Sequence, residues 1–364
     1  MATRRIGIPR DLIIHPGETI ADVLEERGIT QAELAARTGV TPAYVSSVIS
    51  GKKDISAKFA FALEYALGVP KSFWLNLQAN YDSELLEANE SQSITDEEQI
   101  ARESLNEIVK FLRSKGKMPP RESKAASILS LRKVLQISNI ANLKDIVPTG
   151  AFRMAANVTV DSYVLGAWIR LCQIDGEKRE IDVRFDAARI DELIDELKGI
   201  MRNKNAKMPN DLQEVMAKYG IDFSVVKNFR GAPVQGYISL KNDGTYQMVL
   251  TIRGAYADIF WFSLFHELGH IINGDIGRSA KFIDAGSDKV KETAADLFAS
   301  NKLISQEAYD RFVALGRINS IQSIIEFAES QRVMPYIVIG RLQKEKRLEY
   351  HCFSNYKLRY KWAE

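Results

Sequence analysis

Hydrophobic positions in the first eighty residues recur with the three- and four-residue spacing of short amphipathic helices. The pattern predicts four helices: 17–27, 31–37, 41–50 and 57–67. Glycine lies just beyond the end of each segment, and Thr30 and Thr41 stand at the expected N-cap positions of the second and third. Two short helices joined by a tight turn that contains glycine are typical of a helix-turn-helix.

In that arrangement the third helix is the recognition helix, which lies in the major groove of DNA. The predicted DNA-contacting residues are Gln31, Thr41, Tyr44, Ser46, Ser47, Lys52 and Lys53. The third helix holds no arginine, the commonest reader of bases, and residues 1–80 are nearly neutral, with nine basic and eight acidic side chains. A small helical bundle that binds only protein is therefore the alternative.

Three stretches of this region resemble the HigA-type antitoxins, a branch of the XRE helix-turn-helix regulators. They are residues 15–18 (His-Pro-Gly-Glu), 30–35 and 73–81, and the resemblance covers about residues 9–81. It implies a homodimer that binds an operator with two half-sites, with a toxin protein as a further partner. The third helix of that family often carries arginines, and this chain departs from the family there.

The composition changes after Tyr81. Residues 82–98 contain seven acidic side chains and no basic one, which predicts a solvated helical linker. An amphipathic helix is expected over 100–112, because apolar residues recur there at helical spacing. Further helices are expected over 126–135 and 162–174, where the pattern indicates packing and no particular chemistry.

The next part of the chain mixes helical and strand-like patterns. Helices are expected over 186–201 and 210–219, followed by strands within 221–226 and 237–252. Asp243-Gly244 is the hairpin turn signal inside the second of these stretches. We expect a small sheet beside the following helix, with an edge that can hold an extended peptide by strand addition.

An apolar run at 259–265 leads into His266-Glu267-Leu268-Gly269-His270, which contains two of the four histidines in the chain. If the run is helical, residues i and i+4 share one face, so both imidazoles can bind one metal ion. Glu267 lies next to the first of these ligands and is the predicted general base. The alternative is a pair of packed or surface histidines without a metal.

A hydrolytic zinc site takes three protein ligands and keeps one open position. In the helical pattern of 291–299, Glu292 and Asp296 again stand at i and i+4. We predict that Glu292 is the third Zn²⁺ ligand and that Asp296 accepts the other ring N–H of a ligand histidine. Asp275 and Asp258 are weaker rivals for the ligand position, because the first follows a turn signal and the second precedes the helix.

Residues 140–350 resemble the ImmA/IrrE metallopeptidases, through 260–270 and the run that starts at Glu292. The resemblance implies zinc held by His266, His270 and Glu292, with Glu267 as the catalytic residue. The family's second acidic residue in the downstream helix is Ala294 here. The expected fold is α+β and mostly helical, with a helix-turn-helix bundle and a zincin-like domain. The expected divisions are 1–81, a connecting region 82–185, a peptidase domain 186–310 and a C-terminal segment 311–364.

Composition agrees with a multidomain protein of 364 residues, 46% hydrophobic content and a net charge of +2. No apolar run approaches the ~20 residues that span a bilayer, and no apolar segment follows Arg4 and Arg5 as in a signal peptide. We expect a cytoplasmic location without membrane contact. The leading hypothesis is a DNA-binding regulator with a zinc endopeptidase that cleaves itself or a partner repressor under stress. The alternative is a HigA-like antitoxin whose second half is a non-cleaving sensor or toxin-binding module.

Overall fold

The computed structural model describes residues 12–147, 160–176, 179, 181–252, 254–276, 282–283 and 289–362. The chain divides into two compact units: Met1–Gln99 with Arg121–Ser130, and Ile100–Pro120 with Leu131–Glu364. As the sequence predicts, the described part is mostly helical and contains one small sheet. None of its helices is both long enough and apolar enough to cross a membrane.

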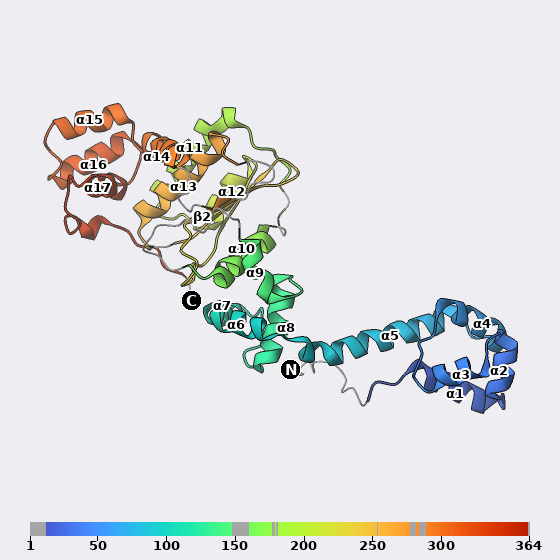
Figure 1. Ribbon diagram of the computed structural model, residues 1–364. Helices are drawn as coiled ribbons and strands as arrows, with labels where there is room; N and C mark the ends of the chain where they lie inside the picture. The colour runs from blue at the N-terminus through green and yellow to red at the C-terminus, as the bar shows by residue number, and fades with distance from the viewer. Residues whose placement is uncertain are drawn as a thin grey trace. The chain divides into compact units, whose positions relative to one another are not determined.

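The first unit begins with the four predicted helices and continues into a fifth (Figure 1). They are α1 (Pro16–Arg27), α2 (Gln31–Thr38), α3 (Pro42–Ile49), α4 (Ala57–Leu67) and α5 (Lys71–Glu90). Both predicted caps are present, because Thr30 Oγ1 accepts from the Glu33 amide at 3.1 Å and Thr41 Oγ1 accepts from the Tyr44 amide at 3.2 Å. The turn between α2 and α3 contains Gly39 at φ 69°, a left-handed conformation that favours glycine.

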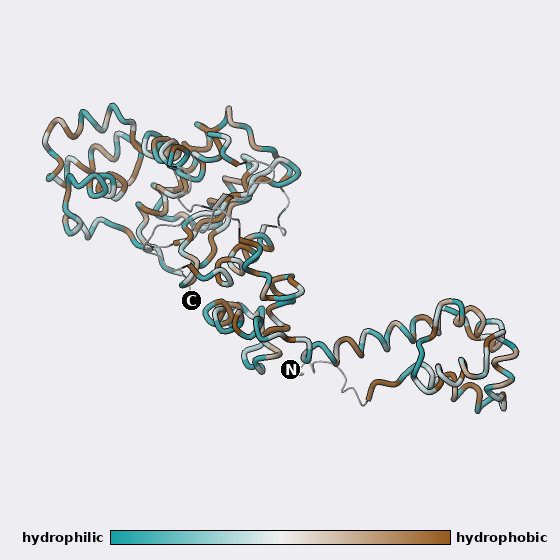
Figure 2. The backbone as a smooth tube through the Cα atoms, in the orientation of Figure 1, coloured by the Kyte–Doolittle hydropathy of each residue, from teal (hydrophilic) through white to brown (hydrophobic). Residues whose placement is uncertain are grey.

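The helices of this unit enclose a core of their own. Fully buried side chains from all five helices meet there: Ile20, Leu34, Val45, Val48, Leu63 and Trp74. Brown and teal alternate along these helices in Figure 2, as expected when one face of each helix is apolar and buried. Gly17 lets α1 approach α3 closely, because any Cβ at that position would overlap the Val48 carbonyl oxygen.

The acidic segment 82–98 is helical as predicted, but it is not solvated throughout. Helix α5 extends to Glu90, a short 3-10 turn follows at Ser91–Ser93, and α6 (Asp96–Ser104) begins soon afterwards. Glu98 is fully buried, contrary to the prediction. Its carboxylate accepts from the Thr95 amide at 3.4 Å, and Thr95 Oγ1 accepts from the Glu98 amide at 3.3 Å. This reciprocal capping box starts α6.

The second unit contains the sheet and the remaining helices. Its elements are α7 (Asn106–Ser114), α9 (Leu143–Ile146), α10 (Ser162–Gly176), α11 (Ile190–Arg202), α12 (Asn210–Ala217), β1 (Ile221–Val225), β2 (Gly236–Leu240), β3 (Tyr246–Leu250), α13 (Ala257–Ile272), β4 (Phe282–Ile283), α14 (Lys289–Leu303), α15 (Gln306–Ala314), α16 (Ile321–Ser330) and α17 (Pro335–Lys344), with 3-10 turns at Ile140–Asn142, Ala187–Arg189 and Ser354–Tyr356. Helices α6 and α8 (Lys124–Leu135) each contribute residues to both units. The single helix predicted over 100–112 is divided between α6 and α7, with Leu105 between them.

The sheet has the strand order β1-β3-β2-β4. The predicted hairpin is confirmed, since β2 and β3 pair antiparallel around a turn with Gly244 at φ 86°. Two pairings were not predicted: β1 runs parallel to β3, and the two-residue β4 pairs with Tyr237 and Ile238 of β2. Ile238 and Met248 point from the sheet into one core with Leu264 and Leu268 of α13.

Helices α13 and α14 pack closely against each other (Figure 1). The approach is close at Gly269, where a Cβ would lie 3.0 Å from Ala295 Cα. Small residues on both helices therefore bring the two backbones together at the turn that carries His266 and His270. This packing places one face of α13 against the first two turns of α14, which contain Glu292 and Ala295.

Candidate metal centre

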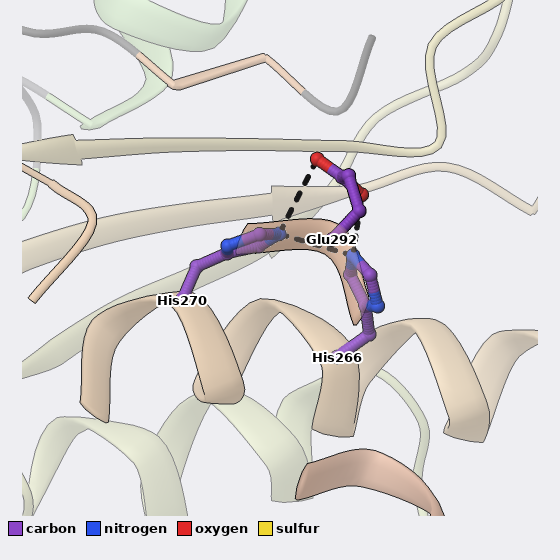
Figure 3. Close-up of side chains that lie close together, drawn as sticks. All are labelled: His266, His270 and Glu292. Carbon is purple, nitrogen blue, oxygen red and sulfur yellow. Dashed lines mark hydrogen bonds and ion pairs between the residues drawn. The ribbon is translucent and has the colours of Figure 1, made fainter. Parts of the chain in front are cut away.

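Three potential ligand side chains converge where α13 meets α14. His266 and His270 project from one face of α13, and Glu292 comes from the first turn of α14 (Figure 3). One ligand atom from each lies within 4.8 Å of the others. His266 Nε2 is 3.0 Å from His270 Nε2 and 3.3 Å from Glu292 Oε2, and His270 Nε2 is 3.8 Å from Glu292 Oε1.

The opposite edge of each imidazole contacts a carboxylate. His266 Nδ1 lies 2.9 Å from Asp296 Oδ1, and His270 Nδ1 lies 2.8 Å from Asp275 Oδ2. Because a carboxylate accepts hydrogen bonds, these contacts assign the ring proton to Nδ1 in both histidines. In neutral rings the two Nε2 lone pairs then face each other, an arrangement that a cation between them stabilises.

Burial and neighbouring charges favour a neutral His270 imidazole and an ionised Asp296 carboxylate. Burial is the largest influence on His270 and lowers its pKa, against the hydrogen bond to Asp275. For Asp296, burial acts to raise the pKa, but the hydrogen bond from His266 and the nearby Lys344 ammonium outweigh it and leave the pKa lowered. The result is a neutral imidazole and an anionic carboxylate, which are the forms that a metal site uses.

The three side chains fit a zinc ion. Glu292 Oε1 is buried and accepts no hydrogen bond from the part of the chain that the structure describes. Tetrahedral ligands at zinc's usual bond lengths lie about 3.3 Å apart, close to the separations seen here. Two imidazoles and one carboxylate with a fourth position left open form the donor set of hydrolytic zinc sites.

Glu267 lies on the sheet side of α13 and is fully buried. Its carboxylate packs against Gly236 at the start of β2, where a Cβ would overlap Glu267 Oε1. Sequence reasoning identified Glu267 but missed Gly236. The available signal was a glycine at the start of a strand, which often marks the close approach of another group.

The two rival acidic residues lie outside the ligand cluster. Asp275 orients His270, a role that sequence reasoning did not assign to it. The turn at Asn273-Gly274, with Gly274 at φ 72°, returns the chain toward the histidine ring. Asp258, eight residues before His266, forms an ion pair with Lys357, with Oδ2 and Nζ 2.8 Å apart.

A cavity of about 750 Å³ adjoins the centre. It runs along α13, where Asp258, Ile259, Phe262, Ser263 and His266 line it. Residues of α14, α17 and the C-terminal segment also line it. Glu292 also lines the cavity, whereas Glu267 and His270 are not among its lining residues.

The predicted DNA-contacting residues fall into two groups. Gln31, Thr41, Ser46, Lys52 and Lys53 are exposed, whereas Tyr44 and Ser47 are half-buried. The hydroxyl groups of Thr41 and Ser47 act within α3, as the N-cap and as a donor to the Ala43 carbonyl at 2.7 Å. Tyr44 packs edge-on against Phe59, with ring centroids 5.1 Å apart. Gln31, Ser46 and the two lysines therefore present the more accessible polar groups.

The geometry of α2, α3 and the intervening turn defines a helix-turn-helix protein. A helix-turn-helix family profile matches residues 20–74. Virulence-associated protein A' of Dichelobacter nodosus is 45% identical over 83 residues, which cover 22% of this chain and 69% of that protein. Virulence-associated protein I of the same organism is 32% identical over 82 residues, which cover 22% of this chain and 75% of that protein. The chain belongs to the XRE family of helix-turn-helix DNA-binding proteins.

Solved structures with detectable similarity include two antitoxins. An addiction module antidote protein of the HigA family from Coxiella burnetii is 24% identical, covers 30% of this chain and 98% of that chain, and has a TM-score of 0.20. The antitoxin GraA is 30% identical. The match covers 24% of this chain and 98% of that chain, with a TM-score of 0.22. The predicted XRE helix-turn-helix domain is confirmed, and the metallopeptidase resemblance of the second unit stays a prediction.

Proposed function

We propose that this DNA-binding regulator carries a zinc-dependent endopeptidase in its second unit. The observation that carries the proposal is the convergence of two buried imidazoles and the Glu292 carboxylate, with both Nδ1 atoms already committed to other carboxylates. His266, His270 and Glu292 would hold the ion. Bound there, zinc would supply Lewis-acid polarisation of a water molecule and of a scissile carbonyl group.

The protein's own groups would then manage position and protons. Asp296 and Asp275 hold the two imidazoles in one tautomer and orientation. Glu267, next to the first histidine, would accept a proton from the attacking water and deliver it to the leaving amine. Gly236 supports this role, because its missing side chain leaves room for the Glu267 carboxylate.

A partner regulator is a better substrate than the chain's own acidic segment. Peptidases bind their substrates extended, often as an added strand. Residues 82–90 lie within α5 and residues 96–98 within α6, so most peptide bonds of that segment are held in helices. Cleavage there would first require local unfolding. An extended segment of another regulator avoids this cost.

The enclosure of Glu267 supports a second candidate function. This side chain is fully buried and does not line the cavity beside the metal centre. A site whose base is closed off can still bind a metal and change affinity for a partner. The chain would then be a HigA-like antitoxin or autorepressor whose second unit is a non-cleaving sensor or toxin-binding module.

The deciding experiment compares the wild type with Glu267→Gln, and with Glu329→Gln as a control at an exposed position. Each zinc-loaded protein is incubated with lysate from stressed cells, and new peptide termini are identified by mass spectrometry. The peptidase proposal expects termini that are produced by the wild type and the control but lost with Glu267→Gln. Identical termini and identical promoter repression in all three would leave the non-cleaving module as the function.

A further inference from the structure

We propose that Lys344 gives the cavity beside the metal centre a preference for an acidic side chain of a bound peptide. The proposal rests on the proposed function, since it names the class of residue that a substrate would place near His266. Lys344 is the last residue of α17 and lines this cavity. It would determine specificity and would take no part in binding the metal.

Lys344 differs from the other charged residues that line the cavity, because they are held by contacts of 3.3 Å or less. These contacts are Asp258–Lys357 at 2.8 Å, His266–Asp296 at 2.9 Å, Arg341–Glu345 at 3.1 Å and His266–Glu292 at 3.3 Å. The Lys344 ammonium lies 4.0 Å from Asp296 Oδ2, beyond hydrogen-bond distance, and its side chain is 67% exposed. Its three donors can therefore meet an incoming carboxylate without the loss of a short contact.

The Lys344 ammonium also lies close to the metal centre. Asp296 stands between them, with Oδ1 at His266 and Oδ2 toward Lys344. The ammonium is 4.4 Å from the centre of the Phe262 ring, which is 6.3 Å from the centre of the His266 ring. A glutamate carboxylate reaches roughly 5 Å from its Cα, and successive residues of an extended peptide are ~3.3 Å apart. A peptide held at His266 can therefore bring a nearby glutamate side chain to this ammonium.

The charge of the lining favours an anionic side chain over a cationic one. Four carboxylates and three cations make the lining net −1, and the proposed zinc ion would change it to +1. One added carboxylate would neutralise this charge, whereas a lysine or arginine of the substrate would increase it. The other two cations, Arg341 and Lys357, are only 14% and 10% exposed, so Lys344 is the cation that a ligand meets.

The test measures binding of three pentapeptides, capped at both ends, to the full-length, zinc-loaded protein by ligand-observed NMR. All positions are alanine except the central one, which is glutamate, glutamine or lysine. The wild type should bind the glutamate peptide about fivefold more tightly than the glutamine peptide, the upper range for an ion pair with a partly exposed cation. Lys344→Gln should remove this preference. Lys344→Glu should reverse it, so that the lysine peptide binds most tightly.

Lys346→Glu is the matched control. Lys346 is exposed, follows Lys344 by two residues and is not among the described residues that line the cavity. The control variant changes the net charge of the protein as Lys344→Glu does, and it should retain the preference for glutamate. An uncapped glutamine peptide, which offers a C-terminal carboxylate, should bind no more tightly than the capped one. Tighter binding that depends on Lys344 would assign this residue to a chain terminus and overturn the side-chain preference.

Three other results would also overturn the proposal. They are equal affinity of the wild type for the glutamate and glutamine peptides, no detectable binding of the glutamate peptide, and a preference that survives in Lys344→Gln. The same spectra show whether the peptides stay intact. A preference that depends on Lys344 supports the proposal even if no peptide is cleaved and the peptidase function fails. Cleavage without the preference supports the peptidase function and overturns the role of Lys344.

Discussion

At the scale of single residues, the structure assigns Gly236 a function that only spatial neighbours reveal. Gly236→Ala should destabilise the second unit by about 1–3 kcal/mol, because the new methyl group must displace the buried Glu267 carboxylate. Urea unfolding measures the change. Gly199→Ala is the matched control, since nothing lies within 4 Å of a Cβ there, and in α11 it should stabilise by about 0.5–1 kcal/mol. Equal effects of the two substitutions would contradict the packing described at Glu267.

Lys198 predicts a pH dependence of stability. Burial lowers its pKa from 10.5 to about 8, while the ammonium donates to the carbonyls of Leu303 at 3.1 Å and Gln331 at 3.2 Å. Between pH 8 and 10.5 the unfolded chain binds more protons at this residue, so the free energy of unfolding rises with pH. The two pKa values alone correspond to a gain of about 2 kcal/mol between pH 7.5 and 9.5. Because the side chain is partly exposed and solvent screens its charge, the wild type should gain about 1 kcal/mol relative to Lys198→Met.

Urea unfolding at the two pH values tests this expectation, with Lys204→Met as a control at an exposed position. The wild type and the control should change alike, and Lys198→Met should differ from both. If all three proteins share one pH dependence, then the buried ammonium does not carry the effect.

At the scale of elements, local signals allowed the first unit to be predicted well. Capping threonines and terminal glycines act within one or two helical turns, so α1 to α4 could be located from the sequence. The parallel pairing of β1 with β3 joins strands separated along the chain, and no local pattern encodes it. Thr95 and Glu98 have the spacing of a capping box, which is a local signal. The prediction of a solvated linker relied instead on the acidic composition of the whole segment.

In the candidate site, too, local sequence patterns predicted some residues, whereas others are brought in only by the tertiary structure. His266, Glu267 and His270 follow from spacing within one helix, and Glu292 from the acidic pattern of the next. Gly236 and the cavity could not be predicted, because they arise where separate elements meet. The sequence pattern marks Asp275 only as a weaker rival ligand, because its contact with His270 depends on the path of the intervening turn.

We predict that helix α3 and the residues after it make two kinds of DNA contact, one that sets sequence preference and one that contributes affinity for any DNA sequence. Lys52→Ala with Lys53→Ala should weaken binding to all DNA sequences about equally and reduce the slope of log K against log salt by about 2. Ser46→Ala should change the preference among sequences. Fluorescence anisotropy at several salt concentrations measures both effects, with Lys58→Ala as a control at an exposed position on α4. A double lysine variant that matches this control would remove the two lysines from the interface.

At the scale of the whole molecule, the chain joins two units that each bury a core of their own. The first unit contains the XRE domain and is therefore the DNA-binding unit. The second contains the candidate zinc site, which determines whether the chain is a regulator with metal-dependent chemistry or a helix-turn-helix protein with an inert extension. Zinc binding at the metal centre therefore decides between these two kinds of protein.

Elemental analysis of the full-length protein, reconstituted with zinc at neutral pH and then desalted, measures zinc binding at this centre. The wild type should retain about one zinc per chain, as expected for one site with three protein ligands. The double variant His266→Ala, His270→Ala should retain almost none. His351→Ala is the matched control, because His351 is exposed and pairs only with exposed Glu349 among the described residues, and it should retain zinc as the wild type does. No bound zinc in the wild type, or full occupancy in the double variant, would contradict a zinc site formed by His266, His270 and Glu292.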